Sequence, residues 1–151
     1  MSGGVRRGDE GSAVVEFVTL GMLLLVPLVY LIFTLGRIQA ASFAADGAAR
    51  EAARAFTSAP DEATGRARAL AAVRLALLDQ GFSTDPASAA GISCSESPCL
   101  TPQGRVAVQV QVDVVLPGIP GFVDRFAPTH VSVRSQQVAA VDAFAGSAAA
   151  S

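Results

Sequence analysis

Three residues near the start of the chain, Gly11, Ser12 and Glu16, could provide a cleavage site and a charge pair. Gly11 and Ser12 lie five and four residues before Glu16. Cleavage after Gly11 would create an α-amine on Ser12, and a four-residue spacing puts that amine and the Glu16 carboxylate on one helix face. The positive end of the helix dipole also favours a carboxylate there. The spacing therefore predicts an ion pair, formed within one subunit or with the amine of a neighbouring subunit.

Glu16 needs such a partner because it borders an apolar segment. An ionised carboxylate inside a bilayer costs up to about 2.5 to 3.5 kcal/mol at mid-membrane. The alternative is that Glu16 only marks the polar edge of the bilayer and extends its carboxylate toward water. The glycine five residues before it, and Phe17 directly after it, favour the pairing role.

The apolar segment that follows predicts one membrane helix. Phe17 to Leu35 comprises nineteen uncharged, mostly large apolar residues, which span roughly 28 Å, close to the ~30 Å hydrocarbon core. Pro27 predicts a kink near mid-membrane. A secretory signal core has only about 7 to 15 residues. Two alternatives stay open: cleavage by ordinary signal peptidase after the small-x-small triplet at residues 42–44, or a plain signal anchor.

The order of the motif favours a prepilin-type leader over residues 1–11. In an ordinary signal sequence the cleavage point lies beyond the apolar core. Here the candidate cleavage point precedes that core, so processing would leave the membrane segment on the mature protein.

The chain resembles the TadE-like proteins of the tight-adherence (Tad) pilus, a group of minor pilins or pseudopilins within the wider type IV pilus assembly systems. Gly11, Ser12, Glu16, Phe17 and the Ala-Ala-Arg-Glu-Ala-Ala-Arg run at residues 48–54 carry the resemblance. It implies cleavage by a prepilin peptidase, retention in the membrane, and contact with other pilin subunits and the assembly machinery of a thin adhesive fibre.

Composition excludes several other functions. The net charge is -2 and acids and bases are interspersed, so no basic face is expected to bind nucleic acid. All eleven basic residues are arginine, which excludes a sortase-built pilus linked through its own lysines. The single histidine, His130, falls in the polar register of a predicted strand without an orienting partner. We therefore expect no enzyme activity, no catalytic residue, no cofactor, no metal and no small-molecule substrate.

The two cysteines lie in a segment that predicts a loop. Residues 83–104 are rich in Ser, Pro, Gly and Ala. Cys94 and Cys99 have four residues between them, which is not the two-residue spacing of zinc or redox motifs. In an exported domain these thiols predict a local disulfide, the alternative being two free thiols.

The rest of the chain predicts an α+β fold, in which the long N-terminal helix continues into an exported domain. Residues 37–56 continue the helix, with Asp46–Arg50 and Glu51–Arg54 pairs. Its alanines at 40, 41, 44, 45, 48, 49, 52 and 53 allow either a second helix or the protein's own domain to approach closely.

A packing helix and a hairpin complete this domain. Ser58 is predicted to cap a second helix that ends at Gly81, with its packing face formed by Leu70, Val73, Leu77 and Leu78. Valines at alternate positions from 106 to 114 predict a half-buried strand, and residues 129–134 a second one. The two strands are joined by a turn-rich connection at residues 117–128 and are expected to form an antiparallel hairpin or small sheet.

The predicted organisation is a leader at 1–11, a transmembrane helix at 12–36, a helical region at 37–82, a loop and β region at 83–145, and a disordered tail at 146–151. Charge counting does not fix the orientation, because arginines flank the apolar segment on both sides. Prepilin processing and the cysteines favour a cytoplasmic N-terminus and an extracytoplasmic domain. The alternative function is a signal-anchored or secreted extracytoplasmic binding module; an exported enzyme is more remote.

Overall fold

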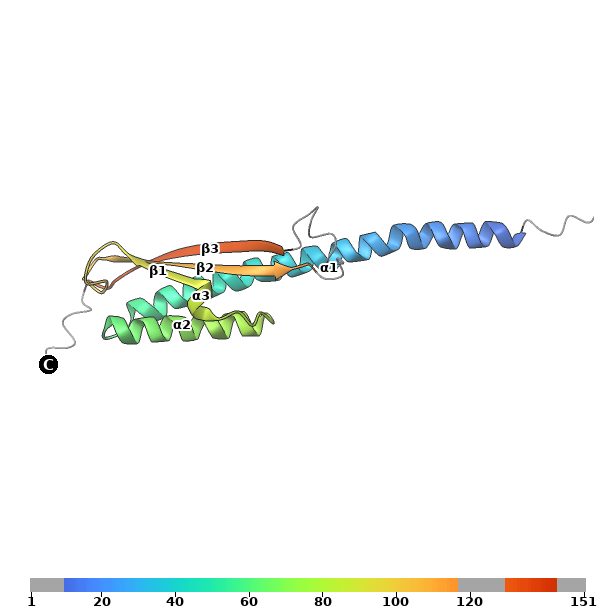
Figure 1. Cartoon of the computed structure of the whole chain (residues 1–151). Helices are drawn as coiled ribbons and strands as arrows, with labels where there is room; N and C mark the ends of the chain where they lie inside the picture. The colour runs from blue at the N-terminus through green and yellow to red at the C-terminus, as the bar shows by residue number, and fades with distance from the viewer. Residues whose placement is uncertain (1–9, 117–129, 144–151) are drawn as a thin grey trace, which may run out of the picture. The chain divides into compact units, whose positions relative to one another are not determined.

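The computed structural model describes residues 10–116 and 130–143, with side chains from residue 13 onward. It has three helices and three strands in the order α1 (Glu10–Thr57), α2 (Glu62–Asp79), α3 (Pro86–Ala89), β1 (Ala90–Cys94), β2 (Arg105–Val115) and β3 (His130–Ala140) (Figure 1). The predicted α+β class is confirmed. The predicted connection at 117–128 and the tail at 146–151 lie outside the described residues.

The chain divides into two compact units, Met1–Gly36 and Arg37–Ser151, and each is considered by itself. We call the second one the folded unit. The division falls where the apolar segment ends, and α1 contributes residues to both units.

A three-stranded antiparallel sheet with the order β1-β2-β3 forms one layer of the folded unit. The predicted hairpin is confirmed: β2 pairs with β3 without interruption from Arg105 opposite Ala140 to Val115 opposite His130. The alternation of β2 puts its five even-numbered valines into the core and leaves residues such as Gln109 and Asp113 on the outer face. Helices cover the valine face (Figure 1).

The prediction of an unbroken loop over residues 83–104 is wrong. This segment contains α3 and also β1, which pairs with β2 from Ala90 opposite Val110 to Cys94 opposite Val106. Its Ser, Gly and Ala content disfavours a strand locally. The backbone hydrogen bonds that β2 makes with this segment outweigh its weak local preference for a loop, because strand formation depends strongly on the neighbouring strand.

The second helix begins later than its sequence predicts. The side chain of Asp61, rather than Ser58, caps α2 by accepting a hydrogen bond of 2.9 Å from the Thr64 N–H. The N–H of Ser58 donates instead to the Arg54 carbonyl, so Ser58 closes the turn that directly follows α1. Asp61 directly precedes the first helical residue, Glu62, so its side chain can reach the free N–H groups of the first turn.

Gly81 ends the helix in the predicted way. It has a φ of 75°, which favours glycine, and its N–H donates to the Leu78 carbonyl. The N–H of Phe82 donates to the Leu77 carbonyl, which completes a Schellman motif. Phe82 and Leu77 are both buried in the core.

The packing face of α2 is shifted from the predicted one. Gly65, Ala69, Val73 and Leu77 are buried at four-residue intervals, whereas Leu78 is exposed and Leu70 is only half-buried. At Gly65 an added Cβ would come within 3.1 Å of the Phe56 carbonyl oxygen. The helix therefore turns its small residues toward α1, and leucine content alone could not show this.

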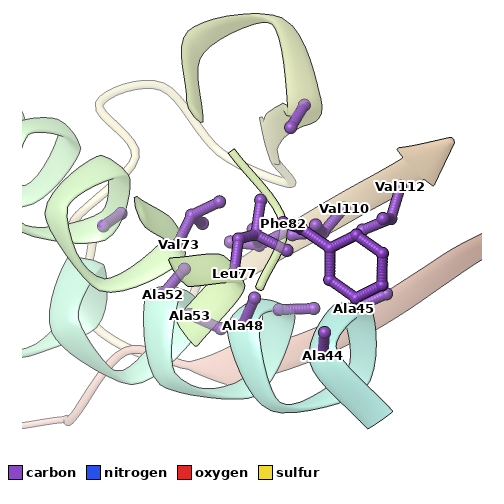
Figure 2. Close-up of a cluster of buried hydrophobic side chains, with 14 of the residues drawn as sticks. Ala44, Ala45, Ala48, Ala52, Ala53, Val73, Leu77, Phe82, Val110 and Val112 are labelled. Atoms are coloured by element: carbon purple, nitrogen blue, oxygen red, sulfur yellow. The ribbon is translucent and has the colours of Figure 1, made fainter. Parts of the chain in front are cut away.

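The alanine face of α1 packs inside its own domain. Alanines 41, 44, 45, 48, 49, 52 and 53 are nearly inaccessible to water. Figure 2 shows several of them beneath Val73, Leu77, Phe82 and the β2 valines. Of the two readings left open by the sequence, the structure selects the helix that lies on its own domain, because alanine lets helix and sheet approach closely.

Candidate membrane and assembly segment

The residues of the predicted cleavage and pairing motif all lie in the first turns of α1. Gly11, Ser12, Glu16 and Phe17 fall within the helix that begins at Glu10. Residues 12 and 16 are therefore one turn apart, with an axial separation of about 6 Å. This backbone geometry is what a pair between the Glu16 carboxylate and an amine on Ser12 requires.

The apolar part of α1 leaves its side chains unburied. Large apolar residues from Val14 to Leu35 are exposed, including Phe17 at 77%. Exposed apolar area of this extent on a soluble protein would be unfavourable at roughly 25 cal/mol for each Å². In the described part of the chain, one helical segment, Ala13–Thr57, is long and apolar enough by length and composition to cross a membrane.

Two threonines of this segment differ in their hydrogen bonding, since the Thr34 hydroxyl has no hydrogen-bond partner among the described residues. The Thr19 hydroxyl donates a 2.7 Å hydrogen bond to the Val15 carbonyl one turn earlier. Pro27 lies inside the helix, and such a proline is tolerated in lipid when neighbouring groups satisfy the freed carbonyl.

Asp46 forms a polar link between α1 and β3 in the folded unit. Its carboxylate accepts hydrogen bonds from Gln137 Nε2 at 2.7 Å and Ser135 Oγ at 3.2 Å, and pairs with Arg50 at 2.8 Å. Hydrogen bonding to Gln137, then to Ser135, and the charge of Arg50 lower the pKa of Asp46 below its ordinary value of 3.8. The Arg50 pair follows the predicted i,i+4 spacing, but the β3 partners are 89 and 91 residues away and no local pattern indicates them.

A second carboxylate is held on the outer face of the sheet. Asp113 on β2 accepts a hydrogen bond of 2.5 Å from the Ser132 hydroxyl on β3 and one of 3.3 Å from Gln111. These bonds lower the pKa of Asp113, that of Ser132 most. His130 is exposed at the start of β3, in the predicted polar register. The Asp113 carboxylate therefore links β2 to β3 through Ser132, which is a role in holding the sheet together.

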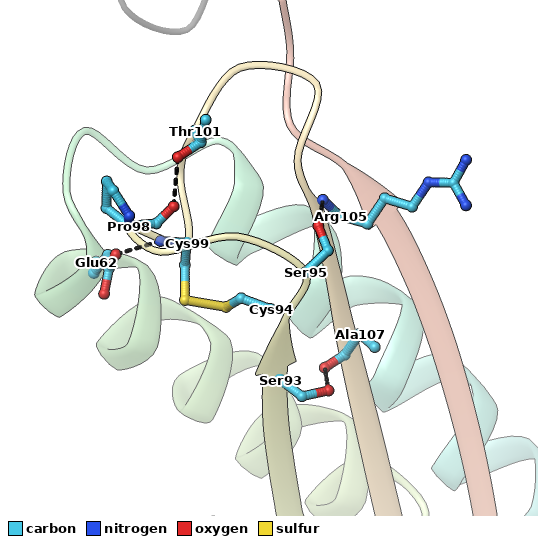
Figure 3. The surroundings of a disulfide bond; sticks show 9 residues. All are labelled: Glu62, Ser93, Cys94, Ser95, Pro98, Cys99, Thr101, Arg105 and Ala107. Atoms are coloured by element: carbon cyan, nitrogen blue, oxygen red, sulfur yellow. Dashed lines mark hydrogen bonds between the residues drawn. A yellow bond between two sulfur atoms is a disulfide. The ribbon is translucent and has the colours of Figure 1, made fainter.

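Cys94 and Cys99 are joined by a disulfide, with their Cα atoms 5.3 Å apart (Figure 3). Cys94 ends β1, and the N–H of Cys99 donates to the Glu62 carboxylate in the first turn of α2 at 2.5 Å. The Ser95 hydroxyl accepts a hydrogen bond of 2.9 Å from the N–H of Arg105, which begins β2. The loop is thus connected to a helix as well as to the sheet. Within residues 10–116 and 130–143, no group of three or more His, Cys, Asp or Glu side chains could hold a metal ion.

These features define a class of protein: a small α+β unit that follows a long apolar N-terminal helix suited to anchoring it in a membrane. Residues 11–54 match the family model of TadE-like proteins, so the resemblance expected from the motif residues is confirmed over this segment. No curated protein and no solved structure gives a match. The TadE-like family implies involvement in Tad pilus assembly, and the match ends within α1 while the sheet and α2 lie beyond it.

Proposed function

We propose that this chain is a pilin-like subunit, anchored in the membrane by the first part of α1, that takes part in assembling a Tad or type IV-like pilus. One observation carries the proposal: the TadE-like match begins at Gly11, where the cleavage and pairing motif meets the apolar helix. The match reaches Arg54 and so includes the alanine face on which the folded unit is built.

In this proposal a prepilin peptidase cuts after Gly11 and leaves the apolar helix on the mature chain. The new α-amine on Ser12 then lies one helical turn from Glu16. Either the same subunit or a neighbour supplies the amine that neutralises the carboxylate. Because an unpaired charge between apolar helices is unfavourable, subunits would dock at the axial position where the pair forms.

The proposed orientation has the N-terminus in the cytoplasm and the folded unit outside. The Cys94–Cys99 disulfide supports this orientation, because disulfides persist in oxidising compartments and are rare in the cytosol. The folded unit also needs no partner to cover the alanine face of α1, since its own sheet and α2 cover it. It could therefore fold before the subunit joins a fibre.

Deleting the gene in its host and counting surface pili tests this role. We expect piliation to be lost or reduced, and to return when the wild-type chain is supplied in trans. Unchanged piliation in the deletion strain would contradict the proposal and favour a membrane-anchored binding module.

A further inference from the structure

Two helix surfaces of the folded unit carry most of its exposed large apolar side chains. In the described part of this unit five such residues are exposed, and three of them, Phe43, Leu75 and Leu78, belong to α1 and α2. Phe43 is 76% exposed, and Leu75 and Leu78 are 63% and 49% exposed. Covering these side chains with a partner is favourable in proportion to the apolar area that is removed from water.

The first surface, which we call the α1 surface, contains Phe43, Gly47 and Glu51. These residues follow one another at four-residue intervals, so they lie along one side of α1, away from its buried alanines. No other part of the chain lies within 4 Å of the place that a Cβ on Gly47 would occupy, so a side chain of a partner can fit next to Phe43. Glu51 is exposed and makes no ion pair within the described residues.

The second surface, which we call the α2 surface, contains Arg68, Ala71, Leu75 and Leu78. They are spaced at three or four residues along the side of α2 that is opposite its buried residues. Arg68 lies two turns before Leu75, is exposed, and makes no ion pair in the described part of the chain. Each surface therefore combines an apolar centre with one unpaired charge, and the two charges are opposite.

The spacings on the two surfaces match when the helices run in opposite directions. Glu51 is eight residues from Phe43, or about 12 Å along α1. Arg68 is seven residues from Leu75 and ten from Leu78, or about 10 to 15 Å along α2. A register in which Phe43 lies between the two leucines therefore puts Glu51 level with Arg68.

The two charges also lie on the same flank of this contact. Seen along each helix from its N-terminus, Glu51 and Arg68 are displaced from the centre of their surfaces in the same rotational sense, given 100° per residue. Helices that face each other in opposite directions put such flanks side by side, where charged residues form interhelical salt bridges. Arg54 is level with Ala67, whose small side chain leaves room for the arginine to extend to solvent.

Contacts within one copy lead to the same register between two copies. A Cβ added at Gly65 would lie 3.1 Å from the Phe56 carbonyl oxygen, so these residues are level where α1 and α2 run in opposite directions (Figure 1). Phe43 precedes Phe56 by thirteen residues, and Leu78 follows Gly65 by thirteen. Two copies side by side without a shift along α1 therefore have Phe43 of one level with Leu78 of the other. Both copies then point in the same direction, as two chains anchored in one membrane must.

We propose that the α2 surface of one copy docks on the α1 surface of a second copy. Leu75 and Leu78 pack around Phe43 and into the gap at Gly47, and Glu51 pairs with Arg68 of the other copy. Each copy has both surfaces, so the contact is heterologous and can repeat into a ring or a filament. This inference rests on the proposed function, for which it names a second copy of the chain as a partner.

Photo-crosslinking from position 43 tests this contact with the full-length chain in the membranes of its host. Phe43 would be replaced by benzoylphenylalanine, which forms a bond to a neighbouring chain on illumination. We expect a product with twice the mass of the chain, in which mass spectrometry maps the bond to residues 71–78 of the second copy. No product, or a product that joins position 43 to a different protein, would overturn the proposal.

Charge exchange tests the salt bridge in the same assay. Glu51→Arg and Arg68→Glu should each reduce the crosslinked dimer several-fold, and the two substitutions in one chain should restore it. Arg66→Glu is the matched control, because it makes the same change at an exposed residue on another side of α2. A double variant without restoration, or equal losses from Arg66→Glu and Arg68→Glu, would contradict the docking.

Leu78→Ala provides a variant that leaves every charge in place. Leu78 is exposed in the single chain, so its truncation should preserve the circular dichroism spectrum of the protein while reducing the crosslinked dimer several-fold. A wild-type yield of dimer from Leu78→Ala would show that the α2 surface is not the one that covers Phe43.

Counting pili separates this contact from the proposed function. Loss of pili on deletion of the gene, together with no crosslinked dimer from the wild-type sequence, would support the role in a pilus and overturn the contact. A crosslinked dimer in a host whose piliation does not depend on the gene would support the contact and overturn the role in a pilus.

Discussion

Gln137 on β3 donates a hydrogen bond of 2.7 Å to Asp46 on α1. This bond connects the edge strand of the sheet to the helix that carries the TadE-like motif. The same carboxylate also accepts from Ser135 and pairs with Arg50. Asp46 therefore holds together two segments that are far apart in sequence, and its ionisation should affect the stability of the folded unit.

The stability of the folded unit should fall at acid pH. The pKa values of Asp46, Asp61 and Asp113 are all lowered from 3.8 by hydrogen bonds that the folded state provides, chiefly those from Gln137, Thr64 and Ser132 respectively. A lowered folded-state pKa gives stability that is present above the unfolded value and is lost as the pH falls through the folded value. Urea unfolding of the full-length protein in detergent should thus show a loss that begins below about pH 4.

Asp46→Asn should remove part of this pH dependence and lower stability at neutral pH. Glu51→Gln is the control, since this exposed acid is on the same helix and makes no ion pair in the described part of the chain. An equal effect of both substitutions would show that net charge matters rather than the contacts of Asp46.

Two adjacent leucines of α2 should respond very differently to truncation. Leu77→Ala should lower the free energy of unfolding by about 2 to 5 kcal/mol, because Leu77 is fully buried in the core. Leu78→Ala should change it by less than about 0.5 kcal/mol, because Leu78 is 49% exposed. Urea unfolding of both variants measures the difference, and similar losses would contradict the orientation of α2.

The Cys94–Cys99 disulfide should form in the exported protein and contribute only locally. Intact-mass analysis of protein alkylated without reduction should show neither thiol labelled. Because the closed loop is small, the bond should contribute less than about 3 kcal/mol. Replacing Cys94 and Cys99 together by serine should leave most of the secondary structure, as measured by circular dichroism. Two freely alkylated thiols would contradict both the bond and the proposed orientation.

The mature protein should begin at Ser12 and stay in the membrane fraction. N-terminal sequencing of protein purified from its host measures this directly. A start at Met1 would indicate a simple signal anchor. A soluble product that begins at Ala45 would instead indicate ordinary signal-peptidase cleavage.

Glu16→Val should leave membrane insertion intact or improved but reduce assembly into pili. The substitution removes a charge from the edge of the apolar segment, and with it the partner of the Ser12 amine. Processing, membrane abundance and pilus number should be measured separately. Thr19→Val is the control, because it removes a polar group whose hydrogen bond stays within the helix. Wild-type piliation by Glu16→Val at equal abundance would contradict the docking role.

The sequence by itself determined the features that depend on neighbouring residues. The apolar run, the valine alternation of β2 and the Gly81 helix end were each predictable, because helix and strand periods and the φ of glycine act locally. The motif from Gly11 to Phe17 and the run at residues 48–54 together indicated the resemblance to TadE-like proteins, which the match over residues 11–54 confirms.

Only the tertiary structure decided which of several acceptable local choices was used. The alanines of α1 suited another helix and the protein's own domain equally well, and the β2 valines together with α2, which cover them, decided in favour of the protein's own domain. β1 forms because its backbone can pair with β2. Leu78 is exposed because α2 turns the face that contains Gly65 toward α1. The partners of Asp46 come from β3, about ninety residues further along the chain. Contacts of this kind depend on the arrangement of whole elements, so the pattern of neighbouring residues could not specify them.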